Sequence, residues 1–315
     1  MNIYKNGNEI ASMRRKLIKQ GEKSATVTVP AKWLQSHHLA VGDEVDILED
    51  NNKLVILPSG ESKKRKEITI SLPKIKQQFT FVGFLRDSVV MSYNAGYDKI
   101  TIHHKANPKI FSELVDTLLS GCEITELTDK KCVIEVVSDL SYKDFDNVML
   151  RLFYITKDMV DDFTNPNMIR HSQTLSKYLI LLQRSVANRE FNHEAEQFYV
   201  TLFHLFTDIG KNCHEINRLI RKGLIQPPEK NNKIYKRINE LVKVMQKAYQ
   251  TSEYMQLHLQ QQKCQRFFYR EFGKYVQAED LVLNTHLIFI YRLLYKSIRP
   301  LFGLLLMNKK SEKGW

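Results

Sequence analysis

The sequence lacks paired cysteines, a long uncharged apolar run and any motif typical of a known catalytic site. Its four cysteines, Cys122, Cys132, Cys213 and Cys264, form no C-x-x-C pair and have no zinc-ribbon spacing. This spacing argues against a structural zinc site. We expect four reduced thiols; the alternative is that Cys122 and Cys132 face each other across a hairpin.

The strongest apolar segment, residues 281–307, contains His286, Arg292, Lys296 and Arg299. These polar residues interrupt the roughly 20 uncharged residues that a membrane-spanning helix needs. The first ten residues also lack the apolar core of a signal peptide. The sequence therefore predicts a cytoplasmic protein with no membrane insertion.

No G-x-S-x-G, P-loop or H-E-x-x-H pattern is present, and no pair of residues suggests a nucleophile with its base. We therefore predict no enzyme activity, no catalytic residue and no cofactor. Positive charge, by contrast, is abundant: 47 Lys and Arg outnumber 35 Asp and Glu, which gives a net charge of +12. This balance favours a polyanionic partner, either nucleic acid or an anionic membrane surface.

Residues 14–58 have the pattern of two hairpins joined by a short helix. Alternating apolar and polar residues predict strands at 15–19, 24–29, 44–48 and 53–57, and Pro30 suits the first position of a helix that ends near Gln35. A unit of about 45 residues buries too little apolar surface to be stable alone. We therefore expect a homodimer, with the basic residues of 1–32 on one face and the acidic residues of the second hairpin on the other.

Ten residues of this stretch resemble the AbrB/SpoVT type of swapped-hairpin DNA-binding domain, in the form common in archaeal regulators. They are Thr28, Val29, Pro30, Trp33, Leu34, Leu39, Gly42, Asp43, Glu44 and Val45. The resemblance implies an interleaved dimer that presents its first hairpins to double-stranded DNA. The DNA-binding residues that it implies are Arg14, Arg15, Lys16 and Lys19 and, at the hairpin tip, Lys23 and Ser24. The same fold also serves as an antitoxin or as a plain dimerisation module.

Residues 60–67 form a basic, polar run that suits a solvated linker or, alternatively, a clamp on DNA phosphates. Beyond this run, alternation predicts strands at 67–72, 99–104, 121–127 and 131–137, with helices at 76–95 and 108–119. Asn107 is a potential cap of the second helix, and Gly96 suits a left-handed helix end. These elements predict a small α/β unit.

From residue 141 onward, apolar residues recur every three or four positions, as in amphipathic helices. The expected helices are 144–163, 169–188, 192–222, 233–255, 260–276 and 278–307. Their short connections favour an antiparallel bundle. The predicted fold class is α+β and multidomain, with a swapped-hairpin β domain at 1–62, an α/β unit at 63–140 and the helical bundle at 141–310.

Three segments, 93–100, 141–159 and 208–216, resemble the PhoU family. The resemblance implies a PhoU-like bundle, as in archaeal phosphate-uptake regulators that fuse it to an AbrB-like domain. Such bundles carry E/D-x-x-x-D repeats whose carboxylates bind metal. In this sequence His204 replaces the acidic residue four positions before Asp208, and the last helix also lacks its acidic pair. We therefore expect no multinuclear metal site.

His204, Asp208 and Glu215 nevertheless share one helix face. A residual mononuclear metal site is one interpretation; a polar layer or a hydrogen-bonded core histidine is the other, and we assign no metal.

The sequence thus predicts a DNA-binding transcriptional regulator of phosphate uptake, dimeric through its N-terminal domain, whose bundle relays a signal from a phosphate transporter or sensor protein. Its two-fold symmetry predicts a pseudo-palindromic operator. The alternative is a PhoU-like adaptor that binds such a transporter or sensor component and uses the hairpin domain only to dimerise. A third interpretation is a metal-storing or metal-sensing bundle.

Overall fold

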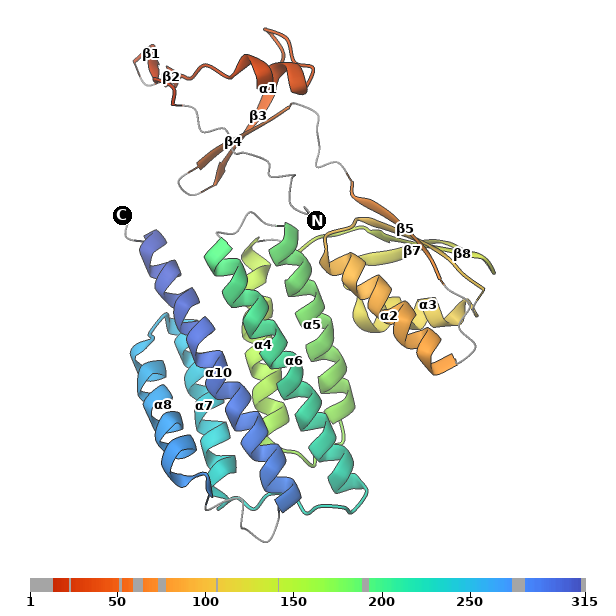
Figure 1. Cartoon of the computed structure of the whole chain (residues 1–315), viewed down its shortest axis with the longest axis vertical. Helices are drawn as coiled ribbons and strands as arrows, with labels where there is room; N and C mark the ends of the chain where they lie inside the picture. Colours follow the sequence, from red (N-terminus) through yellow and green to blue (C-terminus); the bar gives the residue numbers. More distant parts are fainter. Residues whose placement is uncertain are drawn as a thin grey trace, which may run out of the picture. The chain divides into compact units, whose positions relative to one another are not determined.

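The computed structural model describes residues 14–22, 24–50, 53–58, 65–72, 78–105, 107–140, 142–188, 193–273 and 281–312. The chain divides into two compact units, residues 1–64 and 65–315, and each is considered by itself (Figure 1). Lys23 and most of the predicted linker at 60–67 lie outside the described residues.

The N-terminal unit has the predicted order of hairpin, helix and hairpin. Strand β1 (Ile18–Gln20) pairs antiparallel with β2 (Ser24–Thr26), α1 (Ala31–Ser36) follows, and β3 (Val45–Asp50) pairs antiparallel with β4 (Lys53–Pro58). The strands predicted at 15–19 and 24–29 are too long, because backbone pairing joins only three residues of each. Pro30 caps α1 instead of starting it, since its ψ of 132° is extended.

The second unit begins with a four-stranded mixed sheet in the order β5-β6-β8-β7. Its strands are β5 (Glu67–Ser71), β6 (Lys99–His103), β7 (Cys122–Leu127) and β8 (Lys131–Val136). Strand β5 runs parallel to β6, and the other neighbours are antiparallel. The predicted α/β elements are confirmed. The alternative that Cys122 and Cys132 face each other is wrong, because the strand register places Cys122 opposite Val136 and Cys132 opposite Leu127.

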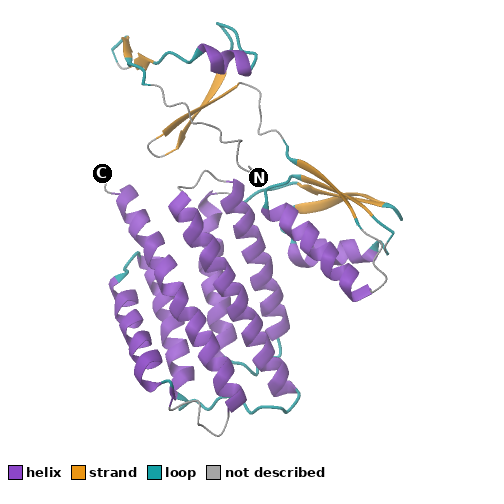
Figure 2. Cartoon of the chain, viewed as in Figure 1, coloured by secondary structure: helices purple, strands orange, loops and turns teal. Residues whose placement is uncertain are grey.

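Helices α2 (Gln78–Asn94) and α3 (Lys109–Leu118) cover one face of this sheet (Figure 2). Ile100 and Ile102 of β6 alternate with polar residues, so both point to the helices and are about 1% exposed. The Asn107 carboxamide oxygen accepts the Lys109 backbone N–H at 3.0 Å, and Gly96 has a φ of +82°. Both predicted end signals of these helices are therefore confirmed.

Long helices make up the rest of the unit and lie side by side in Figure 1. They are α4 (Tyr142–Asp161), α5 (Met168–Asn188), α6 (His193–Arg221), α7 (Lys233–Thr251), α8 (Met255–Arg266) and α10 (Leu281–Glu312), with a π-helical turn η1 (Phe267–Glu271) after α8. The predicted break near residue 277 falls outside the described residues. The helix predicted at 233–255 is too long, because Ser252 adopts a left-handed φ of +54° and ends α7 at Thr251.

Helix α5 packs against both the bundle and the α/β layer. Leu175 and Leu179 lie in the bundle core, whereas Ile180 lies in the core formed with α2, α3 and the sheet. No described helix of the chain has the length and apolar character needed to cross a membrane.

Candidate nucleic-acid interface

The predicted DNA-binding residues lie in and just before the first hairpin. Arg14, Arg15 and Lys16 precede β1, and Lys19 is its middle residue. All four side chains are exposed. Exposed cations of this kind can contact phosphate oxygens.

Ser24 has a structural role in the hairpin. Its residue pairs with Gln20 across the strands, and its hydroxyl donates a hydrogen bond to the Gln20 carbonyl. Gly21 supplies the left-handed turn residue with a φ of +73°. Because a phosphate oxygen needs a donor, and the Ser24 proton is already donated, Ser24 is the least suited of the described candidates to contact DNA.

Apolar side chains of this unit are exposed to an unusual degree. Leu17 is 75% exposed and Leu54 70% exposed. Of the unit's residues whose burial is described, only Pro58 is buried. A unit with this much exposed apolar surface lacks a core of its own, which agrees with the expected need for a second copy.

The comparison with protein families bears on this same stretch. Residues 18–67 match the family described as antidote-toxin recognition MazE, bacterial antitoxin. The N-terminal region is a MazE/AbrB-like domain. The match begins at the first residue of β1 and covers about one sixth of the chain. No curated protein and no solved structure matches the chain.

The family match supports the predicted hairpin fold. Arg14, Arg15 and Lys16 lie just before the matched residues, and Lys19 lies within them. No comparison supports the PhoU resemblance of the bundle.

The three residues considered for metal binding lie on α6 but form no ligand set. His204 and Asp208 are exposed, so the interpretation of His204 as a core histidine is wrong. Glu215 accepts two hydrogen bonds from the Arg218 guanidinium, at 2.7 and 2.5 Å, and these bonds lower the pKa of the Glu215 carboxyl. The searched part of the chain contains no cluster of three or more His, Cys, Asp or Glu suited to a metal ion.

A buried arginine that the sequence did not reveal joins α5 to the α/β layer. Arg184 is 1% exposed; its guanidinium donates to Asp98 at 2.6 Å and to Asp139 at 2.9 Å. It also donates to the carbonyls of Tyr97 at 2.7 Å and Tyr93 at 3.2 Å. Burial lowers the pKa of Arg184, but the hydrogen bonds to the two carboxylates outweigh burial and raise it, so the group stays charged.

Asp98 extends this connection to the start of the second unit. One carboxylate oxygen accepts from Arg184, and the other accepts the Lys66 backbone N–H at 3.0 Å. The Asp98 N–H in turn donates to the Lys66 carbonyl at 2.7 Å. The first residues of the unit are thereby held to α5 through a single carboxylate.

Proposed function

We propose that this protein is a DNA-binding transcriptional regulator that acts as a homodimer through its MazE/AbrB-like domain. The observation that carries the proposal is the set of four exposed cations, Arg14, Arg15, Lys16 and Lys19, at the start of a domain of this type. The net charge of +12 supports a polyanionic partner. In this function the domain contacts phosphates, and residues of the first hairpin reach base edges.

The finer part of the proposal is that the regulator controls phosphate uptake, and that the bundle relays a signal from a phosphate transporter or sensor protein. The PhoU-like segments 141–159 and 208–216 support it; residues 142–159 lie on α4 and residues 208–216 lie on α6. The hydrogen bonds from Arg184 through Asp98 to Lys66 supply a route from the bundle to the residues that follow the N-terminal unit. Operators upstream of phosphate-transport genes are the expected targets.

A second candidate function is an adaptor without DNA binding. The family that matches residues 18–67 is described by its recognition of a protein toxin, so a domain of this type also suits protein recognition. In that case the domain dimerises the chain, and the bundle binds the transporter or sensor component.

A salt series of DNA-binding titrations on a pool of genomic fragments separates the two functions. The test variant is Arg14→Ala/Arg15→Ala/Lys16→Ala. The control, Arg151→Ala/Arg170→Ala/Lys247→Ala, removes the same charge from exposed residues of α4, α5 and α7.

A regulator should enrich a few fragments, with affinity that falls steeply as salt rises. The test variant removes three cations from each protomer and therefore six from the dimer. If each contacts one phosphate, the variant should reduce the log–log salt slope by up to about 5.4, and the control should leave the slope unchanged. Weak binding to all fragments, equal for the unmodified protein, the test variant and the control variant, would contradict sequence-specific DNA recognition and favour the adaptor.

A further inference from the structure

A cleft of about 500 Å³ lies between α2 and α3 of the α/β layer and α5 and α6 of the bundle. This volume falls within the range of about 300–1,000 Å³ that is typical of sites for small ligands. The wall formed by α2 and α3 has an apolar part, which includes Val82, Ile110 and Leu118, beside the polar Arg86, Glu113 and Thr117. Most of the lining residues of α5 and α6 are polar. A surface of this composition suits a molecule with one apolar and one polar end.

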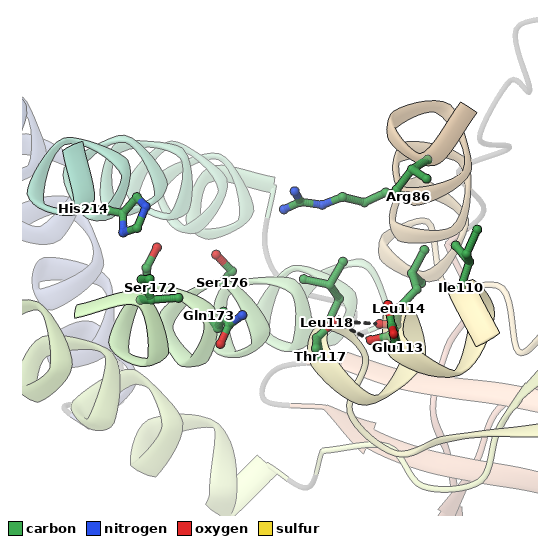
Figure 3. A pocket seen from close by; sticks show the side chains of 12 residues that line it. Arg86, Ile110, Glu113, Leu114, Thr117, Leu118, Ser172, Gln173, Ser176 and His214 are labelled. Atoms are coloured by element: carbon green, nitrogen blue, oxygen red, sulfur yellow. Dashed lines mark hydrogen bonds between the residues drawn. The ribbon is translucent and has the colours of Figure 1, made fainter. Parts of the chain in front are cut away.

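Figure 3 shows the polar groups of the cleft facing one another. The Arg86 side chain extends from α2 across the cleft, toward Ser172 and Ser176 of α5 and His214 of α6. Arg86 is exposed, and its side chain makes no ion pair or hydrogen bond to another described residue. A guanidinium in this position is available for a ligand oxyanion, which it can bind through two parallel hydrogen bonds.

The two serines strengthen this interpretation. They lie one turn apart on α5, on the wall of the cleft. Thr174 and Ser185 of the same helix donate their hydroxyl protons to the carbonyl four residues earlier, at 2.9 Å each. Ser172 and Ser176 make no such bond to a described residue, so their protons remain available.

His214 supplies a further group without a partner. Its Nδ1 atom is buried and makes no hydrogen bond to any described residue, although the ring lines the cleft. A buried polar atom of this kind is uncommon in native proteins and calls for a partner from outside the chain.

The charge of the lining restricts the ligand further. Glu113 of α3 lines the same cleft and is exposed, and no ion pair joins it to Arg86 among the described residues. A carboxylate in the wall repels a multiply charged anion more strongly than a singly charged one. The site therefore suits a ligand with a single negative charge.

We propose that this cleft binds a small amphipathic monocarboxylate. Arg86 and the hydroxyls of Ser172 and Ser176 would hold the carboxylate, and the ligand's apolar body would pack against Val82, Ile110 and Leu118. Every residue involved lies in the second unit, so the proposal stands whether or not the chain binds DNA.

Calorimetric titration of the full chain tests it with two probes, phenylacetate and hexanoate, at millimolar concentration. Phenylacetamide, which lacks the charge, and inorganic phosphate serve as comparison ligands. Both carboxylates should bind, and Arg86→Gln and Ser172→Ala/Ser176→Ala should each weaken them at least about 10-fold. The matched variant Arg151→Gln, which removes an exposed arginine of α4 outside the cleft, should bind as the unmodified protein does.

The proposal would be overturned by no binding of either carboxylate, by equal binding of phenylacetamide, or by binding that Arg86→Gln leaves unchanged. Binding of inorganic phosphate alone would also overturn it, because the site would then select a different anion. Arg86 is exposed, so its substitution should preserve the fold, and a circular dichroism spectrum of each variant verifies this.

Discussion

Arg184 is the residue whose loss should cost the second unit most. The variant Arg184→Met would remove the guanidinium donor from the Tyr97 carbonyl and from the carboxylates of Asp98 and Asp139. The Tyr93 carbonyl would keep one donor, the Gly96 N–H at 3.1 Å. Breaking a buried ion pair costs about 3–5 kcal/mol. Because Asp139 is half exposed, we expect the lower end, a fall of about 3 kcal/mol in the free energy of unfolding.

Urea unfolding of the full chain measures this change, with Arg151→Met as the control. Arg151 is exposed on α4, so its loss should change the unfolding free energy by less than about 0.5 kcal/mol. Equal stability of the two variants would mean that the Arg184 contacts contribute nothing net.

The four cysteines should react slowly with alkylating reagents in the folded protein. Burial raises the pKa of Cys122 and Cys132 to about 12 and that of Cys264 to about 11, and it also raises the pKa of Cys213. At pH 8 about one thiol in a thousand or fewer is then the reactive thiolate. Mass spectrometry after iodoacetamide treatment should find little modification at pH 8 and complete modification in urea. Rapid native labelling of Cys132 would contradict this.

Residues such as Arg184 and Arg86 could not be found from the sequence, for a physical reason. Arg184 bonds to residues 45 to 91 positions away, and no local pattern of α5 records those partners. The cations before β1 were predicted from a family resemblance, and the structure shows only that they are exposed. The interpretation of His204 as a core histidine was wrong, since helical spacing alone does not say which face of a helix is buried.

At the scale of single elements, Gly121 should be required at the start of β7. Its φ is +67°, and a Cβ atom there would lie 2.1 Å from the Ser138 carbonyl oxygen, which is backbone and cannot turn away. Gly121→Ala should therefore lower the unfolding free energy by at least about 2 kcal/mol.

Gly83 of α2 provides the opposite case. A Cβ at Gly83 would meet no atom within 4 Å, and alanine is favoured over glycine in a helix by about 0.5–1 kcal/mol. Gly83→Ala should therefore raise stability in the same urea experiment. A loss of stability in Gly83→Ala would contradict this prediction, and unchanged stability in Gly121→Ala would contradict the prediction for Gly121.

Elements were predicted well where their signal repeats along the chain. The bundle helices show a 3.6-residue period over many turns, which no strand can share. Ends were predicted less well, because Ser252 ends α7 without the usual glycine or proline. The second strand of the first hairpin was also predicted too long. Its alternation of apolar and polar residues continues to Val29, but backbone pairing ends at Thr26.

At the scale of the whole molecule, the second hairpin indicates how the chain associates. Ile47 and Leu54 lie on one face of the hairpin. Ile47 is paired with Ile56 across the strands, and Leu54 lies two positions from Ile56 in β4, so its side chain points to the same face. They are 61% and 70% exposed. This face should be covered by a second copy, since two exposed apolar residues on one face of a small sheet favour association.

The double variant Ile47→Lys/Leu54→Lys should therefore weaken the dimer. Burying each side chain contributes about 1.5–3 kcal/mol, so the dimer dissociation constant should rise at least about 100-fold. Sedimentation velocity would show this as a shift from twice 37.0 kDa toward 37.0 kDa. The control Leu224→Lys/Met255→Lys changes two side chains of the second unit that are each 65% exposed, and it should remain dimeric. A dimer that survives the first variant would place the interface outside this face of the second hairpin.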